Sequence, residues 1–321
     1  MKQEKRATAF AYSMGLPALV VLVGLSVFPL LYILIYSFTD YTLLAREAPA
    51  WVGWANYTEI LQDPYFQQAL LNTIKFAFLA VLLETGLGLL MALQVIRMPS
   101  GQRLLRTLLL LPVLLPGVTV ALTWQTMFSN NDGILNQLLA WFGLPAVNWL
   151  QDPGTAFYAI LAIDAWQYAP FAFLLIYAAL QTVPASQYEA AQLDGAGSWA
   201  RFRYITLPNI QSAILLTALL RMIDSFRLFD KVNILTRGGP ANTTATITQY
   251  IYQNGVRSLK IGYGGAASVL MTLLVLLLSL TYIRRMFPAS GRGAGHRRRV
   301  KQGRAWRLLE RDRQVRRETK P

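Results

Sequence analysis

"EAAQLDGAGSWARFRYITLPNI", which runs from Glu189 to Ile210, is the stretch that decides how the rest of the chain is interpreted. It carries charged residues such as Asp194 and Arg201, yet it lies between two strongly apolar segments. Good helix formers at its start are followed by Gly195 and Gly197, which interrupt a helix. The pattern predicts two short helices and a turn, in a polar loop between two long apolar helices.

The second short helix and the apolar helix after it have recognisable starting residues. Ser198 can cap a helix that begins near Trp199, because its hydroxyl can accept a hydrogen bond from a free backbone N–H. Pro208 then suits the first turn of the next apolar helix, where its missing N–H costs nothing.

The composition is typical of a membrane protein. Of 321 residues, 54% are hydrophobic and only 14% are charged, which is too few for the surface of a soluble domain. The net charge of +14 is concentrated in a tail, since 14 of the 30 Lys and Arg residues follow Ile283. Basic charge alone is no sign of nucleic-acid binding, and no nucleic-acid motif accompanies it.

Several kinds of chemistry are excluded by missing residues. The chain has no cysteine, and its single histidine, His296, cannot build a metal site alone. No motif places a base beside a nucleophile, so we expect no catalytic residues and no enzyme activity. No GxxxxGK[ST] loop is present, so any ATP must be bound by another protein.

Six apolar stretches are long enough to cross a bilayer, which needs about 20 residues for each helix. They predict an all-α, polytopic membrane protein with helices at 14–38, 73–96, 104–127, 156–180, 210–232 and 262–286. Pro112 and Pro116 in the third stretch and Pro170 in the fourth suggest kinks.

The distribution of Lys and Arg predicts the orientation of these helices. Basic residues precede the first helix, mark the second loop and fill the tail, so both termini and the loop 181–209 are expected in the cytoplasm. Arg237, Arg257 and Lys260 would lie outside and break the pattern. The predicted regions are a cytoplasmic N-terminus (1–13), a six-helix permease domain (14–286) and a basic cytoplasmic tail (287–321).

The quoted stretch resembles the EAA loop of membrane subunits of binding-protein-dependent ABC importers. That pattern is EAA, three residues, Gly, about nine residues and then I-x-LP. It is filled here by Glu189, Ala190, Ala191, Gly195, Ile205, Leu207 and Pro208. "WVGWANYTEILQDPYFQQALLNT", "LPVLLPGVTVALTWQTMF" and "ILTRGGPANTTATITQYIY" resemble the carbohydrate-importing branch, specifically the MalF-like member of its permease pair. The resemblance covers about residues 10–286.

The resemblance implies a type I ABC importer permease in the cell inner (plasma) membrane. Such a subunit forms half of a translocation pathway for a sugar or related polyol, together with a second homologous permease. A cytoplasmic ATPase dimer would bind ATP and Mg, and an extracytoplasmic binding protein would deliver the substrate. The loop 181–209 would hold a coupling helix whose contact residues are Glu189, Ala190, Ala191, Gly195, Leu207 and Pro208.

Ionisable residues inside the predicted helices should face the bundle interior or a water-filled path. These residues include Glu84, Asp164 and a run on the fifth helix, where Arg221, Asp224, Ser225 and Leu228 share one face by spacing. Comparison with the resembling family implies a substrate pathway lined by Gln167, Tyr168, Phe171, Arg221, Asp224 and Ser225. The alternative is that Arg221 and Asp224 form a structural ion pair and the aromatic residues only pack.

Two other functions remain open from the residues themselves. A channel or ion-coupled secondary transporter could use Glu84, Asp164 and Asp224 as a proton relay. A membrane scaffold could act through the basic tail, which can also lie on anionic membrane lipid. A further hypothesis concerns the cargo: if Asp224 does not neutralise Arg221, the pathway would favour a phosphate-bearing or acidic substrate.

Overall fold

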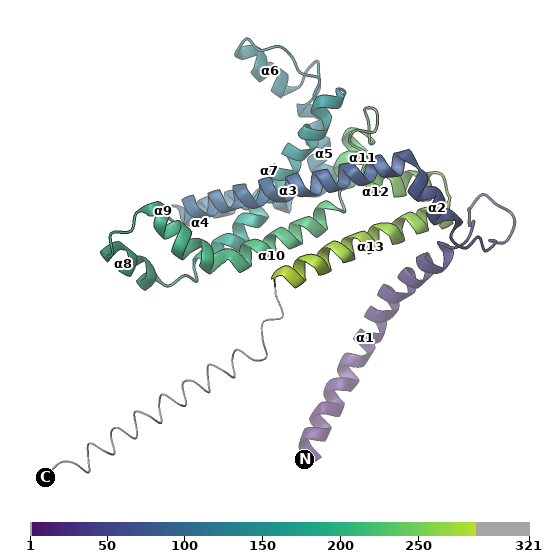
Figure 1. Cartoon of the computed structure of the whole chain (residues 1–321), viewed down its shortest axis with the longest axis horizontal. Coiled ribbons are helices and arrows are strands. Elements are labelled where there is room, and N and C mark those ends of the chain that lie inside the picture. Colours follow the sequence, from purple (N-terminus) through teal and green to yellow (C-terminus); the bar gives the residue numbers. More distant parts are fainter. Residues whose placement is uncertain (1, 287–321) are drawn as a thin grey trace. The chain divides into compact units, whose positions relative to one another are not determined.

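The computed structural model describes the backbone of residues 2–286 and the side chains of residues 15–284. Within these residues the chain is helical and has no strand, only an isolated bridge between Thr39 and Trp51. The α-helices are α1 (Lys2–Tyr36), α2 (Ala55–Gln62), α3 (Pro64–Val95), α4 (Gln102–Leu110), α5 (Gly117–Met127), α6 (Ile134–Trp141), α7 (Pro153–Leu180), α8 (Ala185–Leu193), α9 (Ser198–Arg201), α10 (Leu207–Ser225), α11 (Asp230–Leu235), α12 (Ile247–Ile251) and α13 (Ile261–Met286) (Figure 1). A 3₁₀ turn, Leu111–Leu114, joins α4 to α5, and π-helical turns, Phe202–Thr206 and Tyr252–Arg257, follow α9 and α12.

Five helical segments are long and apolar enough to cross a membrane, and a bent pair of helices makes a sixth. The bent pair, Gln102–Leu114 and Gly117–Met127, turns by 93° at its break. Pro112 and Pro116 cause the break, because proline cannot donate the hydrogen bonds that a helix needs. The six expected spans are therefore confirmed, and the kink expected in the third is a sharp bend.

The centre of the bundle is formed by α3, α7 and α10, which pack against one another (Figure 1). In the most apolar stretch of α7, 67% of the residues are buried. Gly88 of α3 lies so close to α7 that an added Cβ would meet the Cβ of Ala172 at 2.6 Å. The helices therefore approach closely at a small residue, as is common inside membranes.

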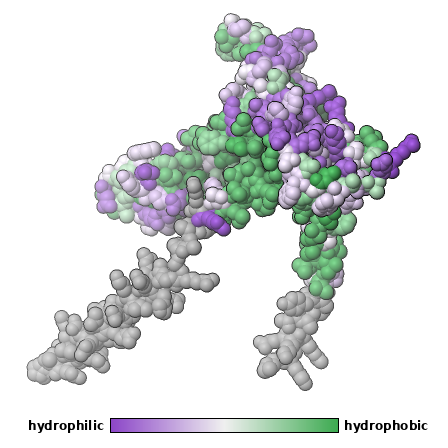
Figure 2. Space-filling model, turned by 45° about the vertical axis from the view of Figure 1, so that its right-hand side comes forward, coloured by the Kyte–Doolittle hydropathy of each residue, from purple (hydrophilic) through white to green (hydrophobic). Residues whose placement is uncertain are grey.

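The first helix differs from the central helices. None of the residues in the most apolar stretch of Gly15–Tyr36 is buried. Figure 2 shows this helix as a column of hydrophobic surface. A helix this apolar needs lipid or another protein around it, because water would not tolerate such a surface.

Two predicted helix boundaries were wrong. The fifth span was expected to run to residue 232, but α10 ends at Ser225 and α11 starts at Asp230. The segment between α10 and α11 is fixed by hydrogen bonds from a later part of the chain, because the hydroxyls of Thr246 and Thr248 both donate to the carbonyl of Leu228. Leu228 therefore leaves the helical face that its spacing had assigned to it.

The second span begins earlier than position 73, because α3 starts at Pro64. Asp63 caps it by accepting a hydrogen bond from the Tyr65 N–H at 2.8 Å. The Tyr250 hydroxyl donates to the other oxygen of Asp63 at 2.5 Å, and burial together with this bond raises the pKa of Tyr250. The 32 residues of α3 span about 48 Å, which exceeds the hydrocarbon thickness of a bilayer.

The C-terminal segment from Leu277 belongs to a separate unit. Its described part ends α13, where the Thr281 hydroxyl donates to the Leu277 carbonyl at 2.7 Å. The basic tail predicted at 287–321 lies outside the described residues, and so does its contact with membrane lipid.

Candidate functional site

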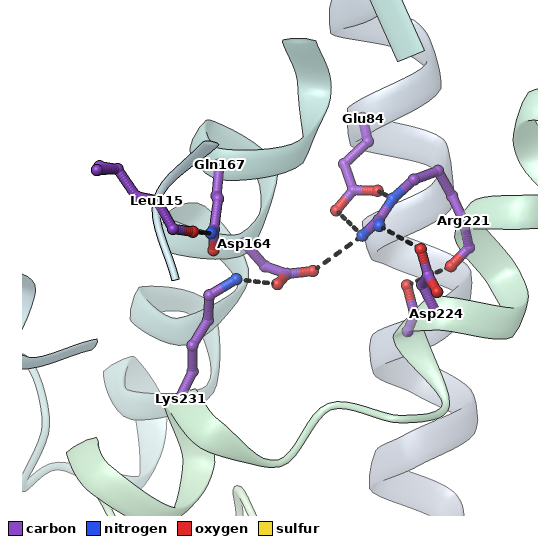
Figure 3. Close-up of polar contacts among 8 residues, drawn as sticks. Glu84, Leu115, Asp164, Gln167, Arg221, Asp224 and Lys231 are labelled. Carbon is purple, nitrogen blue, oxygen red and sulfur yellow. Dashed lines mark hydrogen bonds and ion pairs between the residues drawn. The ribbon is translucent and has the colours of Figure 1, made fainter. Parts of the chain in front are cut away.

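The most unusual feature of the bundle is a buried arginine on α10. Arg221 is 1% exposed, and its guanidinium grips Glu84 of α3 with two nitrogens, Nε to Oε2 at 2.5 Å and Nη2 to Oε1 at 3.1 Å (Figure 3). Its third nitrogen, Nη1, donates to Asp224 Oδ2 at 3.2 Å. The predicted Arg221–Asp224 pair is thus confirmed, but the main partner of Arg221 is 137 residues away in the sequence.

A second cation completes the cluster. Lys231 of α11 binds Asp164 of α7, and the other oxygen of Asp164 lies 3.6 Å from Arg221 Nη2. Both cations lie over the ring of Tyr168, with Arg221 Cζ at 4.0 Å and Lys231 Nζ at 4.6 Å from its centre. We call Glu84, Asp164, Arg221, Asp224 and Lys231 the charge cluster.

The charge cluster joins four helices at one point. Each charge buried alone would cost several kcal/mol, and this cost is offset only when the partners are close and well oriented. Three carboxylates surround two cations, so neither cation is left unpaired. Removing Arg221 or Glu84 would leave a buried partner without its main counter-charge.

A cavity of about 240 Å³ opens beside the charge cluster. Its walls come from α7, from the end of α10 and from the link to α11, and Gly117 contributes from the bend in the third span. Asp224 reaches into it from the cluster, with 55% of its side chain exposed. The cavity is lined by Gly117, Asp164, Tyr168, Arg221, Asp224, Ser225, Arg227, Leu228, Phe229, Asp230 and Lys231.

Four of the six predicted pathway residues line this cavity: Tyr168, Arg221, Asp224 and Ser225. Gln167 does not, because its amide donates to the Leu115 carbonyl at 2.9 Å and so supports the bend. Because of the bend, this carbonyl lies outside the hydrogen bonds within the helices, and the Gln167 amide provides its donor. Phe171 is half-buried on α7 and is also absent from the cavity wall.

Two members of the charge cluster, Glu84 and Lys231, were not among the predicted pathway residues. Glu84 was recognised as an intramembrane charge, but its pairing with Arg221 joins distant segments. Lys231 was overlooked, although the expected fifth span, 210–232, contains it. The sequence did contain a signal for these pairs. Carboxylates in apolar segments, such as Glu84 and Asp164, need cations as partners, and few basic residues lie in apolar segments, so Arg221 and Lys231 were the candidates.

The EAA loop has the two-helix form that was expected. α8 contains Glu189, Ala190 and Ala191, and Gly195 follows it with φ +75°, a left-handed conformation that suits glycine. Glu189 and Ala190 are exposed, and Leu193 is 90% exposed. An exposed leucine beside small residues forms a surface that another protein can cover.

Of two expectations about helix starts after the turn, one was wrong and one was confirmed. Ser198 is the first residue of α9 and not its cap, since Gly197 occupies the cap position without a side-chain bond. Pro208 lies in the first turn of α10, as expected, although helical structure runs without interruption from Ser198 to Ser225. The π-helical turn Phe202–Thr206 lies just before Leu207 and Pro208. A π-helical turn is wider than an α-helical turn, so the backbone continues into α10 although Pro208 has no N–H to donate.

The EAA loop is attached to the base of this long helix. The Tyr188 hydroxyl of α8 lies 2.9 Å from Thr206 Oγ1, and the Asn209 amide donates to Gln187 Oε1 at 2.9 Å. One helix of 28 residues therefore has α8 fixed to its base and Arg221 of the charge cluster near its other end.

Comparison with known proteins identifies the family. The family described as "Binding-protein-dependent transport system inner membrane component" matches residues 84–289. The trehalose/maltose transport system permease protein MalF of Thermococcus litoralis is 35% identical, over 88% of this chain and 95% of that protein. The trehalose transport system permease protein SugA of Mycobacterium tuberculosis is 32% identical, over 88% of this chain and 90% of its own.

Solved structures show the same fold. A chain of a bacterial ABC transporter that imports the acidic polysaccharide alginate superimposes with a TM-score of 0.80 at 23% identity. The alignment covers 90% of this chain and 99% of that chain.

Permeases of this family are multi-pass proteins of the inner membrane and catalyse no reaction themselves. The family match and the extent of the alignments leave no other assignment for the segment that carries both the EAA loop and the charge cluster. This chain belongs to the inner membrane components of binding-protein-dependent transport systems, and it is a permease subunit of an ABC importer.

Proposed function

We propose that this chain forms half of the path by which an ATP-driven importer carries an uncharged sugar or related polyol. The observation that carries the proposal is the unbroken helix from Ser198 to Ser225. A push on its base at Thr206 would move Arg221, about 22 Å further along the helix axis. Closure of an ATPase dimer would thus reach the cavity as a rigid displacement.

The ATPase contact is proposed at the EAA loop. Glu189, Ala190 and Ala191 lie on α8, whose small and exposed residues can enter a cleft of the ATPase. Gly195 supplies the turn, and Leu207 and Pro208 begin α10. ATP and Mg would be bound by the ATPase, with no cofactor in this chain.

An uncharged cargo is supported by the charges around the cavity. The basic residues that line it, Arg221, Arg227 and Lys231, are matched by three acidic ones. Glu84 and Asp224 neutralise Arg221, so the condition under which Arg221 would favour an acidic substrate is not met. Hydroxyl groups can bond to both kinds of side chain, and aromatic rings such as Tyr168 suit sugar faces.

The second permease is supported by the size of the cavity and by α1. A volume of about 240 Å³ is smaller than that of most ligand pockets, which suggests that this wall is half of a path. The exposed apolar surface of α1 is large enough to pack against a homologous subunit. The remaining proposed partner is an extracytoplasmic binding protein, as the family description implies.

The orientation proposed from the charge pattern places both termini and the loop 181–209 in the cytoplasm. A single cysteine at Ala190 tests this, because the chain has no cysteine of its own. An impermeant maleimide should label it only in inside-out vesicles, and addition of the cognate ATPase should protect it. Labelling from outside would overturn the orientation, and labelling without protection would overturn the ATPase contact.

A matched control is a cysteine at Leu44, which is 74% exposed in the loop after α1. It should be labelled only in right-side-out vesicles, and the ATPase should not protect it. The cargo is tested separately by uptake of a radiolabelled sugar in competition with neutral and anionic analogues. Stronger competition by the anionic analogues would contradict an uncharged substrate.

A further inference from the structure

A second polar groove lies at the opposite end of the central helices from the cavity, where α3 ends and α9 begins. It has a volume of about 360 Å³. Its lining residues are Arg97, Tyr188, Ser198, Arg201, Phe202 and Thr206. Its residues are distinct from those around the charge cluster, and two of them, Tyr188 and Thr206, also attach the EAA loop to the long helix.

The groove holds two arginines that lack a carboxylate partner. Among the described residues, neither Arg97 nor Arg201 lies within ion-pair distance of an acidic side chain. The acidic residues of the EAA loop, Glu189 and Asp194, do not line the groove. The groove is therefore positively charged.

Arg201 also has a buried donor without an acceptor. Its Nε atom is inaccessible to solvent and makes no hydrogen bond to the described residues. Its Nη2 atom makes only a long bond of 3.4 Å, to Ser198 Oγ. A buried donor without an acceptor is costly, and an anion in the groove would satisfy it once the Arg201 side chain shifts to open Nε to the groove.

We place the groove near the lipid headgroups, because it lies beyond the end of α3 and has exposed aromatic residues beside it. Arg97 is two residues beyond the end of α3 at Val95, and Arg201 precedes Leu207 by about 9 Å along the helix axis. Trp199 and Tyr204, which are 75% and 78% exposed, flank this position, as aromatic residues do at membrane interfaces.

We propose that this groove binds the phosphate group of an anionic phospholipid. Phosphate is the anion that suits it, because two guanidinium groups can each donate to separate phosphate oxygens. The Ser198 hydroxyl in the same wall can add a further donor. The groove touches α8 through Tyr188 and the long helix through Arg201, so a bound headgroup would brace the base of the EAA loop.

The test uses the complete importer, in which this chain is assembled with its partner subunits. The complex is reconstituted into nanodiscs of phosphatidylglycerol and phosphatidylcholine, then released into detergent, and retained lipid is measured by native mass spectrometry. Arg97→Gln and Arg201→Gln should each lower retained phosphatidylglycerol about fivefold, and the double variant about twentyfold. Retained phosphatidylcholine should not change.

The matched control is Arg203→Gln, which removes an exposed arginine of the same segment that does not line the groove. It should retain phosphatidylglycerol as the unaltered protein does. Equal loss in Arg203→Gln would mean that general surface charge attracts the lipid, and this would overturn the proposal. Unchanged retention in the double variant would overturn it as well.

Two further arms separate other ligands of the groove. Retention of inorganic phosphate in place of lipid, in a complex prepared without anionic lipid, would assign the groove to free phosphate and overturn the lipid assignment. Loss of the ATPase from the double variant with lipid retention unchanged would assign the arginines to a protein contact. If the double variant fails to assemble, Arg97→Lys with Arg201→Lys preserves both charges and should keep most of the lipid, and its complete loss would count against the proposal. None of these readouts depends on the transported substrate.

Discussion

The two ends of the helical segment Ser198–Ser225 differ in which side chains are buried and which are exposed. Near one end an arginine, Arg221, is 1% exposed, whereas near the other the aromatic residues Trp199 and Tyr204 are more than 70% exposed. A soluble protein would do the reverse. Charge is buried where helices of this chain must meet in one arrangement, and apolar surface is left bare where something outside the chain covers it.

The largest effect is expected at the charge cluster. Arg221→Met would leave Glu84 and Asp164 without their shared cation and should destabilise the bundle by about 3–5 kcal/mol. The thermal unfolding midpoint of the purified complex measures this. The double variant Arg221→Met with Glu84→Gln removes charge from both partners, so it should be more stable than Arg221→Met alone. Additive losses would mean that the two side chains are not coupled.

A smaller loss is expected where α3 approaches α7. Gly88→Ala places a Cβ at 2.6 Å from that of Ala172, which should force the helices apart at a cost of about 1–3 kcal/mol. Gly86→Ala, two residues earlier on the same helix, meets nothing within 4 Å and should be neutral or slightly stabilising. Equal unfolding midpoints for the two variants would show that the approach at Gly88 is not tight.

In the turn of the EAA loop, a substitution should be limited by backbone conformation and not by steric contact. Gly195 has φ +75° in open surroundings, so Gly195→Ala should cost about 1–2 kcal/mol from backbone strain alone. Gly197→Ala is the control, because Gly197 has φ −66° and is equally unobstructed. Substrate-stimulated ATP hydrolysis by the complex should fall in Gly195→Ala and persist in Gly197→Ala.

The smallest effect on stability is expected at the exposed surface of α8. Leu193 is 90% exposed, so Leu193→Ser should change the free energy of unfolding of this subunit by less than about 0.5 kcal/mol. The same change should weaken attachment of the ATPase about tenfold, as measured by its dissociation from immobilised permease. Normal attachment would show that this leucine faces lipid or water in the assembled importer.

The sequence predicted those features that depend on residues close together in the chain. Runs of about 20 apolar residues located the spans, and Gly195 located the turn of the EAA loop, because both signals depend on neighbouring residues. The i to i+3 spacing also predicted the pair between Arg221 and Asp224. These features need no knowledge of which helices meet.

Long-range pairing could not be predicted in this way. Arg221 and Glu84 come from helices 137 residues apart, and Lys231 reaches Asp164 only because α10 ends at Ser225. That end depends on threonine hydroxyls from another loop, which no pattern within α10 reveals. The site was therefore predicted by residue type on α7 and α10, while its partners on α3 and α11 needed the structure.

The buried arginine also has a consequence for how the chain enters the bilayer during synthesis. The most apolar stretch of Ser198–Ser225 has a mean hydropathy of 1.3, the lowest of the five single-helix spans, and a buried arginine adds to the cost of inserting the span. Glu84 and Asp164 precede Arg221 in the chain, so a ribosome delivers both carboxylates to the membrane first. The order of the helices along the chain thus lets the fifth span leave the translocon directly into a site that already holds its counter-charges.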